Sequence, residues 1–220
     1  RSPQRWSRKG FSEFFKGEKM VTMRSPGLIP RTILDNNHGY FNESAIGFKL
    51  WIDLKNVENK SLSKSYKNMT ERLQFESISQ NYSYLSLLAI MNSSFIRYEL
   101  NTNRRSNIHV YPEDWKMLLI PIISIENKNM LEELASKMQS YADNIHIQRS
   151  RFLKRLQQQP NWENIKITAA LEQFDTLTFR DFVKELSKQK IRLSLAQQDE
   201  WEEYFGQYKL ECNTITEQIS

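Results

Sequence analysis

Two long apolar repeats in the second half of the chain restrict most strongly what it can fold into. The first contains Leu131, Leu134, Met138, Tyr141, Ile145, Phe152 and Leu156, and the second contains Trp201, Tyr204, Tyr208, Cys212, Ile215 and Ile219. Apolar residues at this near-heptad spacing line one side of a helix, which is stable only when another element covers it. The pattern therefore predicts two long helices packed as an antiparallel hairpin. Between them, Thr178 is placed to cap a shorter helix.

The first half of the chain has a different pattern, in which short β-branched runs alternate with turn residues. The runs "MVTMRS", "RTILD" and "YFNESAIGFKLWI" predict strands, the last one bent at Gly47, and "PGLIP" and "NNHG" predict the turns between them. A helical turn is expected at "SEFF". Residues 55–80 are polar and predict a long surface connection. Between Tyr82 and Leu100, apolar residues at three- and four-residue steps predict one amphipathic helix whose stripe includes Phe95 and Tyr98.

Two further strands are expected in "NIHVY" and "MLLIPII", with a short helical turn from Pro112 through Trp115 between them. The expected fold class is α+β. Residues 1–125 should form a mixed α/β domain with a small twisted sheet. Residues 126–220 should form a helical region built on the long antiparallel hairpin.

Charge is distributed unevenly along the chain. Residues 1–125 hold 18 Lys and Arg against 11 Asp and Glu, whereas residues 157–220 hold 7 against 11. This asymmetry predicts that the first half meets a polyanion and the second does not. It is also compatible with charges that only keep the domain in solution.

Several classes of protein are disfavoured by the composition. No apolar run reaches the roughly 18–20 residues of a membrane span, and the basic N-terminus lacks an apolar signal core. The single cysteine, Cys212, cannot form an internal disulfide, which favours a reducing, cytoplasmic location. The six glycines form no phosphate-binding loop, and the three histidines lie far apart, so neither a nucleotide site nor a zinc site is expected.

Residues of the types that bind nucleic acid are more abundant than residues for a nucleotide or zinc site. Arginine can pair with the O6 and N7 edge of guanine, and asparagine with the N6 and N7 edge of adenine, while cations in general neutralise phosphates. The stretch "NTNRRSN" carries more such groups than a surface turn requires. The candidate DNA-binding residues are Arg24, Arg31, Asn37, His38, Asn103, Arg104, Arg105 and Asn107. The basic residues near the N-terminus, including Lys19, are expected to contact the DNA backbone.

Two alternatives remain open at the level of the sequence. Asp35 together with "Asp53-Leu54-Lys55" matches the pattern of carboxylates and lysine with which many nucleases hold Mg²⁺ and orient a water molecule. Asp35 also lies in a turn, where aspartate is common for structural reasons. The third possibility is a helical interaction scaffold with little affinity for DNA.

The order of several motifs resembles a known family. These are a strand led by Lys19 with Arg24 downstream, a turn with Asp35, Gly39, Tyr40 and Phe41, the helix "LAIMNS", and an extended segment into "LIPI". Together they resemble the TaqI-like C-terminal specificity domain of bacterial adenine-specific DNA methyltransferases and fused type IIG restriction-modification enzymes. The second half is similar to the helical extension of the same enzymes.

The resemblance implies a target-recognition domain that is not itself an enzyme. Such a module grips double-stranded DNA and positions the target adenine for a methyltransferase domain of the same polypeptide. That other domain would bind S-adenosylmethionine, and Mg²⁺ if the parent enzyme also cleaves DNA. The chain begins at Arg1, contains no Asn-Pro-Pro-aromatic motif and is expected to be a piece of such an enzyme, with no cofactor of its own. The family reads different DNA sequences, so the resemblance assigns no base-contacting residue.

Overall fold

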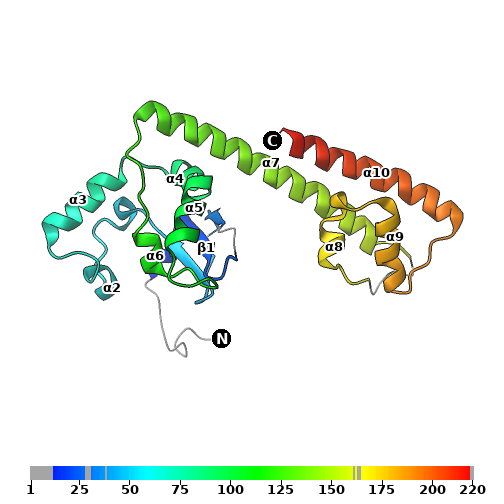
Figure 1. Cartoon of the computed structure of the whole chain (residues 1–220), viewed down its shortest axis with the longest axis horizontal. Coiled ribbons are helices and arrows are strands. Elements are labelled where there is room, and N and C mark those ends of the chain that lie inside the picture. Colours follow the sequence, from blue (N-terminus) through cyan, green and yellow to red (C-terminus); the bar gives the residue numbers. More distant parts are fainter. Residues whose placement is uncertain (1–11, 28–30, 38, 161, 163–164, 219–220) are drawn as a thin grey trace. The chain divides into compact units, whose positions relative to one another are not determined.

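The protein, described here from a computed structural model, has an α+β fold, as predicted. The structure describes residues 12–27, 31–37, 39–160, 162 and 165–218. It forms two compact units, residues 1–136 and 137–220, which are treated separately below (Figure 1). The predicted division at residue 125 coincides with the start of α7 (Ile125–Gln157), whose first turns pack on the core of the first unit through Leu131. Within the described ranges, no helix is both long enough and apolar enough to cross a bilayer.

The first unit is built on a three-stranded antiparallel sheet with the order β2-β1-β3. β1 (Lys19–Met23) pairs with β2 (Thr32–Asp35) on one side and with β3 (Ala45–Phe48) on the other. Side chains alternate between the two faces of a strand, so Met20 and its cross-strand partners Leu34 and Phe48 share one face. That face forms the core together with the helices that follow. The third strand is shorter than the predicted run over residues 40–52, which continues as a 3₁₀ turn, η2 (Trp51–Leu54).

The helical cover of the sheet consists of two helices where the sequence predicted one. α4 (Tyr84–Met91) ends at Asn92, and α5 (Ser94–Asn103) begins after Ser93, whose hydroxyl caps it. The side chain of Asn92 accepts a hydrogen bond from the N–H of Thr32 and donates one to its carbonyl, both at 2.9 Å. The amide thus pairs with the edge strand β2 as a further strand would. This contact joins residues sixty positions apart, and sequence periodicity does not register it.

Neither "NIHVY" nor "MLLIPII" forms a strand, and both predictions were wrong. Val110 donates one backbone hydrogen bond to the carbonyl of Arg24 at 2.8 Å, without a continuing ladder. The predicted helical turn is present as α6 (Pro112–Lys116). After it, Leu118 and Ile120 pack on the core while Leu119 between them is exposed, and the alternation is lost after Pro121, where Ile122 is exposed and Ile123 packs on the core. Only residues 118–121 therefore have the alternation of a strand, and Pro121 has no amide hydrogen to donate to a ladder.

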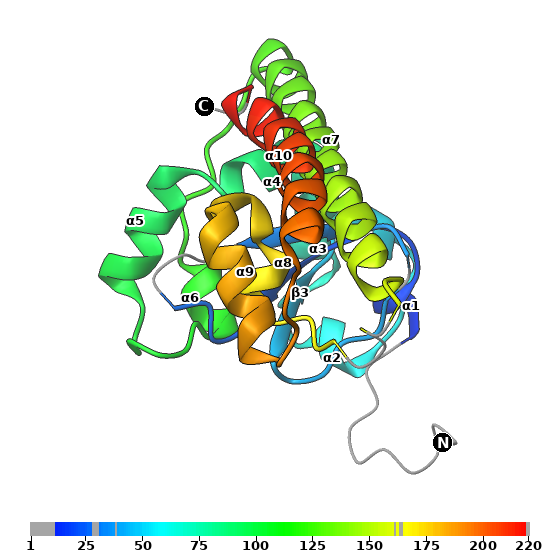
Figure 2. The ribbon, with the colours of Figure 1, turned by 90° about the vertical axis from the view of Figure 1, so that its right-hand side faces the viewer.

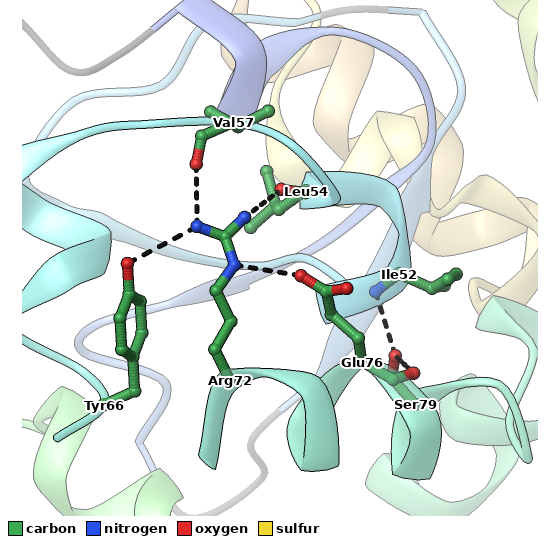
Figure 3. A network of polar contacts seen from close by, with 7 residues as sticks. All are labelled: Ile52, Leu54, Val57, Tyr66, Arg72, Glu76 and Ser79. Carbon is green, nitrogen blue, oxygen red and sulfur yellow. Dashed lines mark hydrogen bonds and ion pairs between the residues drawn. The ribbon is translucent and has the colours of Figure 1, made fainter. Parts of the chain in front are cut away.

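Residues 55–80, predicted as a surface connection, contain α2 (Lys60–Ser63) and α3 (Met69–Ser79), each capped by an asparagine. The polar composition concealed a buried ion pair, in which Arg72 Nε lies 2.9 Å from Glu76 Oε1 (Figure 3). The same guanidinium donates to the carbonyls of Leu54 at 2.8 Å and Val57 at 3.0 Å. Arg72 therefore fastens the loop after η2 to α3.

The second unit is a helical domain with an aromatic core. It contains the rest of α7, α8 (Ala169–Glu172), η3 (Phe174–Thr176), α9 (Phe179–Lys188) and α10 (Leu195–Glu217). Within it, α10 runs back along the C-terminal part of α7, as the predicted hairpin requires (Figure 2). Phe152 of α7 stacks on Phe174 with ring centroids 3.7 Å apart and contacts the rings of Trp201 and Phe205 on α10.

The heptad stripe of α7 is covered only in part. Phe152 and Leu156 are fully buried, whereas Leu134 and Met138 are about half exposed. Arg149 completes the buried end with two 2.7 Å hydrogen bonds to the carboxylate of Asp175. Thr178 caps α9 as predicted, since its side chain accepts a hydrogen bond from the Asp181 N–H.

Cys212 should react slowly with thiol reagents in the folded protein. Burial raises the pKa of its thiol to about 11, and the neighbouring Asp175 carboxylate adds to the increase. Because the thiolate is the nucleophile, labelling at pH 8 should be at least about a hundredfold slower than in the unfolded chain, where the thiol pKa is near 8.5. The comparison is made with an aromatic disulfide reagent in buffer and in guanidinium chloride, and equal rates would contradict this burial.

Candidate nucleic-acid interface

Two segments far apart in the sequence meet at one end of the sheet. The turn after β1 (residues 24–27) lies beside the segment that follows α5 (residues 104–111). The Arg104 guanidinium donates to the carbonyl of Gly27 at 2.9 Å, and Ser25 Oγ lies 2.7 Å from His109 Nδ1. Together with the hydrogen bond from Val110 to Arg24, these contacts bring Arg24 and Arg104 to the same surface.

Tyr111 lies at the centre of this surface. The guanidinium of Arg24 is 5.2 Å from the centroid of its ring, and that of Arg105 is 5.9 Å away. Both distances fall within the range of cation–π attraction. We call Arg24, Arg104, Arg105 and Tyr111 the arginine cluster.

Carboxylates hold one member of the arginine cluster in place. Arg105 Nε donates to Asp114 Oδ1 at 3.0 Å, and Asp114 Oδ2 accepts the N–H of Tyr111 at 2.7 Å. Burial by itself would raise the pKa of Asp114, but the hydrogen bonds from Tyr111 and Arg105 outweigh it and lower the pKa. Asp114 is therefore ionised at neutral pH and neutralises part of the charge of Arg105. Glu113, at 3.5 Å, adds a weaker exposed contact.

Arg31 belongs to the same end of the sheet. Its carbonyl accepts a hydrogen bond from the Thr22 hydroxyl at 2.9 Å, and the register pairs Thr22 with Thr32. The side chain of Arg31 is exposed beside the strand end from which Arg24 emerges. The structure thus brings Arg24, Arg31, Arg104 and Arg105 to one end of the sheet.

Asn37 lies at the opposite end of β2. The register pairs Lys19 with Asp35 there, and the Asn37 N–H donates to Asp35 Oδ1 at 2.8 Å in a local turn. His38 falls outside the described residues. The two turn residues were predicted to act with Asn103–Asn107, and the strand separates Asn37 from that segment.

The asparagines of the predicted loop are placed differently from one another. Asn101 and Asn103 lie within α5, so the loop is shorter than predicted. Asn103 donates to Glu99 Oε2 at 3.2 Å, while Asn107 is exposed beyond the helix. The loop therefore begins at Arg104.

Lys19 cannot contact DNA, contrary to the prediction for the N-terminal basic residues. Its side chain is fully buried and its ammonium lies 2.7 Å from Asp35 Oδ2 and 3.2 Å from the carbonyl of Phe15. The ion pair with Lys19 lowers the pKa of Asp35, although burial opposes it. A Cβ at Gly39 would lie 2.8 Å from that carboxylate, so the turn has no room for a side chain there.

The proposed metal-binding carboxylates have structural partners. Asp35 is paired with Lys19, and Asp53 accepts a 2.6 Å hydrogen bond from the Tyr84 hydroxyl. Lys55 is exposed. In the part of the chain that the structure describes, no three His, Cys, Asp or Glu residues are grouped to hold a metal ion. The geometry gives the nuclease alternative no support.

Sequence reasoning missed two features of this surface. The sequence pattern places Tyr111 in a strand. Its contact with two guanidinium groups is seen only from the distances of Arg24 and Arg105 to its ring. Phe95 and Tyr98 were assigned to the buried stripe of one long helix, but the break at Asn92 turns them outward. The Asn-Ser-Ser sequence at residues 92–94, which suits a helix start, was the available signal.

Comparison with known proteins assigns part of the chain. Residues 124–220 match the model of a domain of unknown function, DUF8810. The match covers α7 through α10 and leaves the sheet and the arginine cluster outside it. No curated protein and no solved structure matches the chain.

Proposed function

We propose that this chain is a DNA-recognition module of a larger bacterial adenine-N6 DNA methyltransferase or fused restriction-modification enzyme. The observation that carries the proposal is the convergence of Arg24, Arg31 and Arg104 from separate segments at one end of the sheet. Repulsion between these arginines disfavours an arrangement that brings them close together. A bound polyanion would reduce that repulsion. The resemblance of the first half to TaqI-like specificity domains supports duplex DNA as that polyanion.

In this proposal the module contributes binding and no chemistry of its own. Arg24, Arg31 and Arg104 contact phosphates and hold the duplex in register. The methyltransferase domain of the same polypeptide would bind S-adenosylmethionine and receive the extruded adenine. Extrusion of a base costs a few kcal/mol, and a firm grip on the flanking duplex helps to offset that cost. The second unit, whose 12 basic and 12 acidic residues balance, would brace the module in the larger enzyme.

The proposal predicts strongly salt-dependent binding of the chain to random-sequence duplex DNA. If about six phosphates are neutralised, affinity should fall about a thousandfold between 50 and 200 mM salt. Fluorescence anisotropy with a labelled duplex measures this slope directly. A helical scaffold would show weak binding and a flat slope, which would contradict the proposal.

A matched pair of variants locates the contact. Arg31→Gln removes an exposed charge beside the arginine cluster and should weaken binding to all sequences while reducing the salt slope by about one. Arg180→Gln removes an exposed arginine from α9 in the second unit and should change neither. Equal effects of the two variants would mean that only the overall charge of the chain matters.

A further inference from the structure

The outer face of α5 exposes large aromatic side chains beside the arginine cluster. Phe95 is 52% exposed and Tyr98 is 66% exposed, whereas Ile96 and Leu100 on the inner side are 0% and 1% exposed. The inner pair fixes the rotation of the helix on the core. The outward position of the aromatic side chains therefore follows from the packing of α5, and a rotation that buried them would expose the core pair.

Position on the helix puts Tyr98 in the middle of this outer face. At 100° per residue, Arg97 falls on one flank of Tyr98, and Phe95 and Thr102 fall on the other. Arg97 is exposed, and its guanidinium forms no ion pair with any residue that the structure describes. An exposed face that combines aromatic rings with a free cation is typical of a binding surface.

The arginine cluster follows the C-terminal end of α5. α5 ends at Asn103, and Arg104 and Arg105 follow directly. Both arginines already donate hydrogen bonds within the protein. Arg104 donates to the carbonyl of Gly27, and Arg105 donates to the carboxylate of Asp114. Their donor groups are therefore partly occupied, which makes the exposed side chains of α5 further candidates for contacts with bases.

We propose that α5 is the element that enters the major groove, with Arg97 and Tyr98 in contact with base edges; this rests on the DNA-recognition function proposed above. The groove is about 12 Å wide and admits a helix, and ten residues extend about 15 Å along it. Arg97 has the forked geometry that pairs with guanine O6 and N7. The rings of Tyr98 and Phe95 supply apolar surface of the kind that contacts thymine methyl groups.

Charge favours DNA over a protein as the occupant of this face. The single acidic residue of α5, Glu99, lies 100° from Tyr98 on the side opposite Arg97, and its carboxylate accepts a hydrogen bond from Asn103. The arginine cluster extends the positive potential from the helix end. If this face bound a protein instead of DNA, the variants described next would have the same affinity for DNA as the wild type.

The test uses the whole chain and a duplex selected from a randomised library by the wild-type protein, compared with its scrambled form. Arg97→Gln and Tyr98→Ser should each reduce the preference for the selected duplex by about 5- to 150-fold, the range for a lost base contact. Tyr98→Phe should retain most of it. Leu73→Ser on α3, a residue 57% exposed, serves as the apolar control, and Arg180→Gln serves as the charge control.

A second measurement shows whether α5 lies in the major groove. Methylation of guanine N7 in the selected duplex should block wild-type binding if α5 occupies the major groove, because N7 lies on that edge. Two results would overturn the role of α5 and leave the DNA-recognition function in place, provided that wild-type binding depends steeply on salt. One is wild-type binding that N7 methylation does not affect. The other is variants of Arg97 and Tyr98 that keep the full preference for the selected duplex. If the wild type shows no salt-dependent binding at all, both proposals fail.

Discussion

Replacement of Arg72 by methionine is expected to destabilise the first unit by about 3–5 kcal/mol. Arg72 is 4% exposed, and its loss would leave the carboxylate of Glu76, 6% exposed, without its cation. The carbonyls of Leu54 and Val57 would lose their donors as well. Urea unfolding followed by the fluorescence of Trp51, whose ring lies 5.4 Å from that of Phe75 on α3, measures the effect.

A surface ion pair provides the control for this variant. Lys184 and Asp181 pair on α9 with both side chains about half exposed, so Lys184→Met should change stability far less than Arg72→Met does. Replacing Glu76 by leucine in the Arg72→Met background should recover part of the loss, because it removes the unpaired charge. A loss below about 1 kcal/mol in the single variant would show that water enters and solvates the site.

Truncation of Phe152 to alanine is expected to cost the second unit about 3–5 kcal/mol. The ring is fully buried and lies against rings from η3, α9 and α10, so its removal leaves a cavity where several elements meet. These rigid aromatic neighbours cannot easily move to fill the space. Denaturant unfolding monitored by circular dichroism and by Trp201, whose ring is 5.9 Å from that of Phe152, gives the change.

Leu210→Ala is the corresponding control on α10. Leu210 is 68% exposed, so its truncation removes little buried surface and should change stability by less than about 0.5 kcal/mol. If Phe152→Ala and Leu210→Ala have similar effects, the aromatic core does not hold this unit together.

The candidate site was predicted in part. Arg24, Arg31, Arg104 and Arg105 were named from residue type, and the structure brings them to one end of the sheet. Their individual surroundings were not predictable, because each depends on a partner in another segment. Lys19 illustrates the limit: its sequence context is that of a surface cation, yet a cross-strand aspartate holds it in the interior.

Local pattern determined the features that depend on neighbours in the sequence. The two long helices, the cap at Thr178, the turn at Pro112 and the α+β class follow from apolar spacing and from residues that end or start a helix. These signals act over a few residues, which is why they can be recognised without a structure. The same signals could not show that Asn92 breaks the predicted helix by pairing with Thr32.

Tertiary structure decided which side chains are available to a ligand. The break at Asn92 turned Tyr98 outward, contacts with Gly27 and Asp114 occupied Arg104 and Arg105, and pairing with Glu76 buried Arg72 in a polar segment. Each outcome depends on groups brought together from distant parts of the chain. The free energy of those long-range contacts decides whether a side chain can contact a ligand. Residue type alone does not predict it.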